Sequence, residues 1–324
     1  MPKILTNTIL FLVSSTICLL CLEASLRLFS DVVPEIPASE QPWFRNNDKA
    51  VREFQVDAEL GFIPLMGGKS YTEFGTLRND NPVEKRGDVR RVLFLGDSVT
   101  KRQKITKPLE ALYGNESYRF WNAGVTSFNT TQELNFYRRY NAALKPDEVI
   151  LFFHLNDFET TPVAFRDDAG RFVVYSPHTP LTRINRPLLI YSYLYRMYVN
   201  ASLSRKKERP DFSDEVKTSL SQLRDMLSAG NVSFKVVLLP ILNPTEQWTT
   251  REKTSRANII RILGELNIAS FDLLEIMNKA LEEKVMVQES PGDHWHPSAE
   301  MGKRFAMYLF EQGLLEQKSY TNRK

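Results

Sequence analysis

From residue 90 onward, short apolar runs alternate with longer amphipathic stretches, and this alternation constrains the fold more than any other feature of the sequence. The apolar runs have the length of strands and end near polar, glycine or proline turns; they are residues 92–95, 118–121, 149–153, 234–239 and 268–271. Between them, residues 133–144, 216–227 and 259–266 carry apolar side chains at helical spacing. We therefore predict an α/β fold with a parallel sheet that helices cover on both faces.

A polar turn follows the first apolar run and supplies a candidate nucleophile. Residues 92–95 run into Gly96, Asp97 and Ser98, so a buried strand would stop in a turn that can present a hydroxyl. A serine hydroxyl is a weak nucleophile at neutral pH, so it needs a histidine base, an acid that orients the base and donors for the oxyanion. Ser98 could instead cap the helix that follows. Asp97 is expected to stabilise the turn.

Four histidines could serve as the base: His154, His178, His294 and His296. His296 is favoured because it follows Asp293 by three residues, a spacing that lets one turn bring the carboxylate to the imidazole. Pro297 comes next and suits the first residue of a helix through residues 301–315. Asp293 would hold the Nδ1 proton and leave Nε2 free to accept from Ser98. His294 is the rival base, and His154 is interpreted as a structural histidine or a wall of the site.

Two further residues are candidate oxyanion donors, because each follows a predicted strand. Gly124 comes after residues 118–121, and Asn156 comes after residues 149–153. Parallel sheets bind ligands beyond the carboxyl ends of their strands, so Ser98, Gly124 and Asn156 should converge at one edge. Gly124 would offer its backbone N–H and allow close approach of a substrate. Asn156 would offer its amide, although it could also be a turn former.

In their order along the chain, the Gly96–Ser98 block, Gly124, Asn156 and the block from Asp293 to His296 resemble the GDSL or SGNH hydrolase family. That family is named for its Ser, Gly, Asn and His blocks, and the resemblance covers residues 88–315. It implies an α/β/α sandwich with a parallel, flavodoxin-like sheet. His154 departs from the pattern, because it stands where a glycine often precedes Xaa-Asn-Asp.

The resemblance also implies a mechanism and a class of substrate. Ser98 would be the nucleophile, His296 the base and Asp293 its orienting acid, while the N–H groups of Ser98 and Gly124 and the Asn156 amide would hold the oxyanion. Ester substrates are implied, and no cofactor is required. We expect carbohydrate O-acetyl esters first and lipid esters second. The alternatives are an O-acyltransferase that modifies a surface polysaccharide and a non-catalytic glycan-binding module.

The N-terminal segment, residues 1–29, is predicted to target a membrane. Residues 4–22 are apolar with short polar interruptions and follow Lys3. A retained anchor is favoured over a cleaved signal peptide, since no small-Xaa-small cleavage site follows cleanly. Lys3 on the inner side would place the rest of the chain outside the cytoplasm. Both cysteines, Cys18 and Cys21, lie in this segment, so no disulfide framework is available, and lipid attachment is a minor alternative.

Three other segments surround the predicted catalytic domain, residues 88–317. Residues 30–87 begin as a proline-rich spacer and continue as a small irregular or β-type subregion that borders the site. Residues 158–211 are an insertion, longer than an ordinary connection and rich in tyrosine between Tyr191 and Tyr198. It is predicted to be a helical lid or an aromatic platform for a sugar or acyl chain. Residues 318–324 form a tail.

Composition sets limits on partners. The net charge is +3 over 324 residues and the basic residues are scattered, so nothing points to nucleic acid. The basic stretch 205–209 is interpreted as a solvated loop, with a membrane-surface patch as the alternative. No histidine pair has metal-ligand spacing and no cysteine is available to help, so a metal site is not expected. The oligomeric state is left open.

Overall fold

The computed structural model describes residues 3–29, 53–84, 87–166, 172–175, 185–204 and 212–316. His178, the basic stretch 205–209, the tail 318–324 and most of the spacer lie outside these residues. The chain divides into two compact units. Unit 1 comprises Met1–Arg52, Val56–Phe62 and Pro162–Pro210, and unit 2 comprises Glu53–Gln55, Ile63–Thr161 and Asp211–Lys324. The insertion therefore groups with the N-terminal helix, a division different from the expected boundaries.

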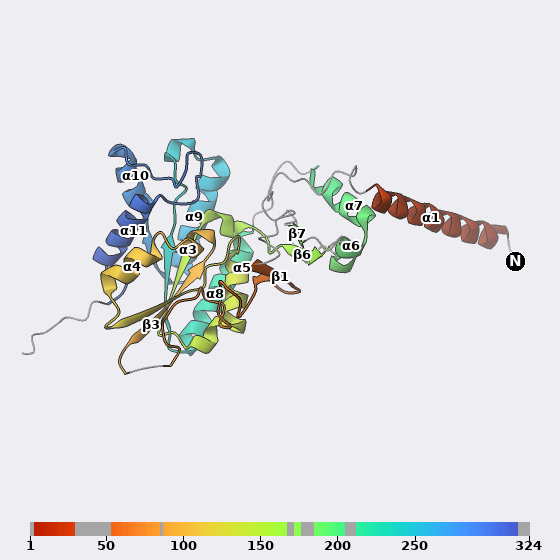
Figure 1. Ribbon diagram of the computed structural model, residues 1–324. Coiled ribbons are helices and arrows are strands. Elements are labelled where there is room, and N and C mark those ends of the chain that lie inside the picture. Colours follow the sequence, from red (N-terminus) through yellow and green to blue (C-terminus); the bar gives the residue numbers. More distant parts are fainter. Residues whose placement is uncertain are drawn as a thin grey trace, which may run out of the picture. The chain divides into compact units, whose positions relative to one another are not determined.

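Unit 2 is built on a five-stranded parallel sheet (Figure 1). Its strands are β3 (Arg90–Gly96), β4 (Tyr118–Asn122), β5 (Glu148–Phe153), β8 (Ser233–Leu238) and β9 (Ala269–Asp272). They are ordered β4-β3-β5-β8-β9, and every neighbouring pair is parallel. This is the 2-1-3-4-5 order of flavodoxin-like sheets. The predicted fold class is confirmed, and the five predicted strands are present with ends shifted by one or two residues.

Helices cover both faces of the sheet. They are α3 (Ser98–Lys101), α4 (Thr106–Tyr113), α5 (Thr130–Arg139), α8 (Ser213–Ala229), α9 (Thr250–Glu265), α10 (Leu274–Glu282) and α11 (Ala299–Glu311). Leu93 and Leu95 belong to the core cluster beneath α5, α8 and α9, whereas Val92 and Phe94 belong to the cluster beneath α4, α10 and α11. Because side chains alternate along a strand, β3 is apolar on both faces, as a buried parallel strand requires.

Two predicted helices have different ends in the structure. The stretch 133–144 forms α5, which ends at Arg139, followed by a short 3₁₀ helix at Asn141–Leu144. The C-terminal helix does not begin at Pro297. Ser298 caps it by accepting a hydrogen bond from the Met301 amide at 3.0 Å, while Pro297 forms a β-bridge with Gln288. The cap outweighs the preference of proline for the first helical position.

Residues 53–84 contain β1 (Phe54–Asp57) and β2 (Gly61–Pro64), which pair in a two-stranded sheet, and then an irregular stretch. The division between the units runs through both strands. Within unit 2, the Asn79 and Asn81 amides donate to the Phe120 carbonyl oxygen on the edge strand β4. The Tyr71 hydroxyl donates to the Gly124 carbonyl oxygen at 2.8 Å. The irregular stretch thus covers the sheet edge next to one candidate site residue.

Unit 1 contains α1 (Lys3–Leu28), an antiparallel pair β6 (Val163–Arg166) and β7 (Phe172–Tyr175), and the helices α6 (Arg186–Tyr191) and α7 (Tyr193–Ser204). A small core of Val163, Phe165, Leu189 and Val199 joins the strand pair to the helices. The helices match the helical prediction for the insertion, but the strand pair was not predicted. By length and composition, α1 could cross a membrane, and a signal sequence would pass the same test.

Candidate active site

The candidate site lies at the carboxyl ends of β3 and β5, where the strand order reverses. Ser98 is the first residue of α3, directly after β3. The turn between them depends on Gly96, whose φ is +146° and where a Cβ would lie 2.1 Å from the Thr100 hydroxyl oxygen. Asn156 belongs to the short 3₁₀ helix Leu155–Phe158 that follows β5. The switch point of such a sheet is the usual ligand crevice.

Ser98, His296 and Asp293 form one chain of hydrogen bonds. The Ser98 Oγ lies 2.9 Å from His296 Nε2, and His296 Nδ1 lies 2.9 Å from both carboxylate oxygens of Asp293. The His296 amide also donates to Asp293 Oδ1 at 3.1 Å. Nearly two hundred residues separate the serine from the histidine, yet the three predicted side chains meet with the geometry of an activated nucleophile.

A short loop presents the acid and the base. Its ends are closed by the Glu289 amide, which donates to the His296 carbonyl oxygen at 2.9 Å, and by the Ser298 amide, which donates to Val287. The Arg102 guanidinium, just after α3, pairs with Glu289 and lies 4.0 Å from Asp293 Oδ2. Partial burial works to raise the pKa of Asp293, but hydrogen bonds from His296 outweigh it and hold the pKa below its usual range. Asp293 is therefore a carboxylate at neutral pH.

Asp97 connects the serine turn to Asn156. Its Oδ1 accepts from the Val99 amide at 2.8 Å, and its Oδ2 accepts from Asn156 Nδ2 at 3.0 Å. Asp97 is buried. Because an amide nitrogen carries two hydrogens, Asn156 keeps one for another acceptor while Asp97 fixes the side chain. The expected turn-stabilising role of Asp97 therefore extends to orienting the candidate oxyanion donor.

Gly124 has a different role in the structure from the one expected. Its amide donates to Asn122 Oδ1 at 2.9 Å, so in this conformation the N–H is engaged and does not support the predicted role of oxyanion donor. A Cβ at this position would lie 2.4 Å from the Lys101 amide nitrogen and 2.8 Å from the Thr100 carbonyl carbon. Glycine is required here because the loop after β4 packs directly on the backbone of α3.

The other described histidines do not contact Ser98. His294 is exposed and its Nδ1 lies 3.0 Å from the Gln288 amide nitrogen. His154 is buried, and burial lowers its pKa although the Asp97 charge and contacts with the Asn156 side chain and the Pro240 backbone act in the opposite direction, so it is neutral at neutral pH. Its ring meets Trp295 edge to face at 4.8 Å. His154 thus forms a wall behind the site, and half-exposed Trp295 stands beside His296.

A pair of buried acids near the site was not found by sequence reasoning. Both carboxylate oxygens of Glu133, in the first turn of α5, lack a hydrogen-bond partner among the described residues. Burial, and then the Asp97 charge, raise the pKa of Glu133 well above its usual range. Burial likewise raises the pKa of Asp157, together with the charges of Glu133 and Asp97. Asp157 directly follows Asn156, which is a signal in the sequence, but nothing in the sequence marks Glu133.

Glu289, Asp293 and His296 place ligand atoms within 4.8 Å of one another, close enough to share a metal ion. Arg102 and Lys104 both pair with Glu289, and these cations oppose a metal at the same carboxylate. Asp293 is also engaged by His296. The donor set thus fits the hydrogen-bonded acid and base better than a metal centre.

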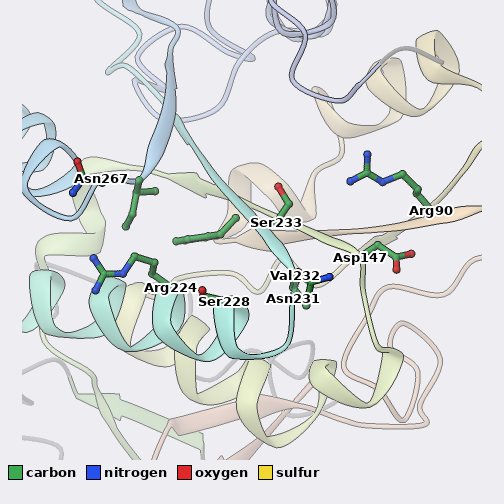
Figure 2. Close-up of a pocket in the computed structure, with 10 residues that line it drawn as sticks. Arg90, Asp147, Arg224, Ser228, Asn231, Val232, Ser233 and Asn267 are labelled. Atoms are coloured by element: carbon green, nitrogen blue, oxygen red, sulfur yellow. The ribbon is translucent and has the colours of Figure 1, made fainter. Parts of the chain in front are cut away.

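A separate hollow of 380 Å³ opens at the amino ends of β5 and β8 (Figure 2). Arg90, Asp147 and Ser233 line one part of it, and Arg224 and Asn267 line another. The Arg90 guanidinium pairs with Glu148 at 3.3 Å, and Arg224 donates to the Leu266 carbonyl oxygen at 2.8 Å. Since Ser98 and Asn156 follow the carboxyl ends of their strands, this hollow is not part of the candidate site.

No protein-family model matches the chain, and no curated protein matches it. Solved structures resemble it in fold. The acetylxylan esterase Axe2 from Geobacillus stearothermophilus is 18% identical, with a TM-score of 0.48, over 72% of this chain and 98% of that chain. LAE5, an alpha/beta hydrolase enzyme from the metagenome of Lake Arreo in Spain, is 14% identical, with a TM-score of 0.48, over 70% of this chain and 97% of that chain. At these identities the likeness concerns the fold alone, so the function is inferred from the chain's own residues.

Proposed function

We propose that the protein is a serine ester hydrolase of the SGNH type, held at a membrane by α1 with unit 2 outside the cytoplasm. The observation that carries this proposal is the continuous hydrogen-bonded chain from Ser98 Oγ through His296 to Asp293. A nucleophile paired with a base that an acid orients is the arrangement that acyl transfer requires. Lys3 before the apolar stretch supports the orientation.

The reaction proceeds in two halves. Ser98 Oγ attacks the ester carbonyl while His296 Nε2 takes its proton, and the same proton then passes to the leaving alcohol. Water next attacks the acyl-serine, with His296 again the base, and releases the acid and free Ser98. The oxyanion in both halves would accept from the Ser98 amide, which is unpaired within α3 because it lies in the first turn, and from the second hydrogen of Asn156 Nδ2.

Acetylated carbohydrates are the preferred substrate class. Trp295 is 42% exposed beside His296, and its contact with His154 fixes the ring. A rigid aromatic face of this kind suits a sugar ring better than a flexible acyl chain. Trp295→Ala should raise KM for an acetylated oligosaccharide by about tenfold and leave KM for p-nitrophenyl acetate nearly unchanged. Equal effects on both substrates would argue against a sugar at this position.

The test of the reaction itself is to measure acetate release from p-nitrophenyl acetate and acetylated oligosaccharides, with and without sugar acceptors. A fluorophosphonate probe should label Ser98 covalently, and the Ser98→Ala chain is the matched control. Release to water supports the hydrolase. Transfer to added sugar would favour the O-acyltransferase, and absence of both release and labelling would leave only glycan binding.

A further inference from the structure

The last turns of α1 are built into unit 1 through Glu23. Its carboxylate accepts hydrogen bonds from the Ser192 hydroxyl and from the Tyr193 and Leu194 amides, each at 3.0 Å. These groups form the beginning of α7, where backbone N–H groups have no partner within the helix. The Ser192 hydroxyl accepts from the Tyr195 amide at 3.2 Å as the local cap of α7, and the Glu23 carboxylate of α1 adds a second cap to the Tyr193 and Leu194 amides.

Arg27 strengthens the same junction. It pairs with Glu23 at 3.1 Å, donates to the Tyr191 carbonyl oxygen at the end of α6, and lies 5.7 Å from the centre of the Tyr193 ring. Arg196 of α7 donates to the Leu189 carbonyl oxygen at 2.7 Å. Charged side chains thus join the three helices α1, α6 and α7; Figure 1 labels these helices along the ribbon.

The position of Glu23 along α1 sets its depth in a bilayer. Residues 4–22 are uncharged, and nineteen residues at about 1.5 Å each span about 28 Å. The hydrocarbon core of a bilayer is about 30 Å thick. If α1 crosses the membrane, Glu23 lies where the hydrocarbon ends, and the start of α7, which it caps, lies at the same depth.

The α6–α7 helices expose apolar side chains on both sides, along the chain, of the Glu23 contact. Leu189 and Val199 are buried in the small core of unit 1, whereas Leu188, Tyr191, Met197 and Tyr198 are exposed. Leu188 and Tyr191 are three residues apart, so they share one face of α6. Tyrosine is typical of the membrane–water boundary, because its ring is apolar and its hydroxyl is polar.

We propose that the α6–α7 helices lie in the headgroup layer of the membrane that α1 crosses, with Leu188, Tyr191, Met197 and Tyr198 in contact with lipid. The proposed partner of these exposed side chains is the lipid bilayer, because α1, which contacts the start of α7 through Glu23, would cross that bilayer. The proposal depends on α1 crossing the membrane and remaining in the chain. It does not depend on the ester chemistry of unit 2.

The test places one nitroxide label at a time on the full chain in phospholipid vesicles. Cys18 and Cys21 are first replaced by alanine, and Tyr191→Cys, Tyr198→Cys or Met286→Cys is then introduced. Tyr191 and Tyr198 are 72% and 68% exposed, and Met286, in unit 2, is 65% exposed, so any difference reports what covers each position. Leu188→Cys tests the same face if the Tyr191→Cys chain fails to insert. Val13→Cys, in the middle of α1, reports the span itself.

Collision with oxygen, which concentrates in lipid, is compared with collision with a water-soluble nickel complex. Labels at 191 and 198 should meet oxygen readily and meet the nickel complex about tenfold less than the label at 286. Nickel accessibility equal to that at 286, at either position, overturns the proposal. Exclusion of both reagents also overturns it, because that result means a protein covering. If the label at position 13 is removed with a cleaved segment, or collides readily with the nickel complex, α1 does not span the membrane and this proposal is wrong. That conclusion is independent of whether the protein hydrolyses esters.

Discussion

The two units of the chain differ in which residues depart from ordinary burial: unit 2 buries ionisable side chains, and unit 1 exposes apolar ones. In unit 2, polar and ionisable groups such as Asp97, Glu133 and His154 are buried behind the carboxyl ends of the sheet. In unit 1, apolar and aromatic groups such as Tyr191 and Tyr198 are exposed on α6 and α7. Burying an ionisable group is costly, and exposed apolar side chains that gather in one region often mark a contact surface. The first pattern indicates chemistry, and the second indicates an interface.

The comparison implies that the two properties can be removed separately, and the largest effect is expected at the nucleophile. Ser98→Ala should lower kcat by about 10⁴-fold or more, since the members of one catalytic relay act as a unit. His296→Ala should match it. The fold and the membrane attachment should be unchanged, as vesicle flotation and thermal unfolding would report.

His294→Ala is the matched control for the base, because His294 faces Gln288. Its activity should stay near that of the unchanged chain. If His294→Ala were more damaging than His296→Ala, the base would be reassigned. Activity retained by Ser98→Ala would remove the nucleophile assignment altogether.

The next effect in size concerns the oxyanion. Asn156→Ala should lower kcat by roughly 10²–10³ with little change in KM, as expected for the loss of one donor. In the unchanged chain, Asp97 accepts a hydrogen bond from Asn156. Asn156→Asp keeps the shape of the side chain but replaces this donor with a second carboxylate that faces Asp97. It should be at least as inactive. Steady-state kinetics and a melting curve separate this from a turn former, which would lose stability first. A folded and nearly fully active Asp variant would exclude Asn156 from the mechanism.

The sheet of unit 2 could be predicted because its central strands β3 and β5 are buried along nearly their whole length and because helical stretches alternate with the strands. Ser98 and Asn156 could be placed for the same reason, since each directly follows a strand. The engagement of the Gly124 amide could not be predicted, because it depends on the rotamer of Asn122, two residues earlier. Nor could the burial of Glu133, because an acid in the first turn of an amphipathic helix is usually solvated and favours that position through the helix dipole.

Unit 1 was less predictable. The tyrosines between 191 and 198 recur at both alternating and helical intervals, so the pattern does not choose between conformations. The strand pair β6–β7 is short, with four residues in each strand. The pairing of Glu23 with the start of α7 joins residues about 170 positions apart, and no local signal in the sequence specifies such a contact.

A smaller effect concerns how the free energy of unfolding depends on pH, which tests the buried carboxyl group of Glu133 without measuring catalysis. The folded-state pKa of Glu133 is raised by burial, so the folded chain holds this proton more tightly than the unfolded chain. Stability from this group is complete below the unfolded pKa and is lost as pH rises toward the folded pKa. Glu133→Gln should therefore reduce the loss of stability with pH by up to about 1.4 kcal/mol per pH unit.

The measurement is urea unfolding between pH 5 and pH 9, with Glu110→Gln as the control. Burial, partly offset by Lys107, raises the pKa of Glu110 to about 7, so its substitution should change the slope only below that pH. An unchanged slope for Glu133→Gln would mean that Glu133 is ionised and paired in the folded chain. The burial pattern of unit 2 would then need another explanation.

The smallest effect on activity is expected when the membrane part is removed. A chain beginning near Gln41 lacks α1 but keeps every residue of the candidate site, so kcat/KM for p-nitrophenyl acetate should change by less than about threefold. Unit 1 should respond instead, because α7 loses the Glu23 cap, a change of about 0.5–2 kcal/mol for typical caps. Limited proteolysis should then cut within α6 or α7 faster than in the full chain, while α8 to α11 remain protected.

Glu23→Ala in the full chain is the matched variant, since it removes the Glu23 cap and keeps the apolar span. If truncation abolished activity while Glu23→Ala did not, α1 itself would contribute to unit 2, and the separation of the two units would be wrong.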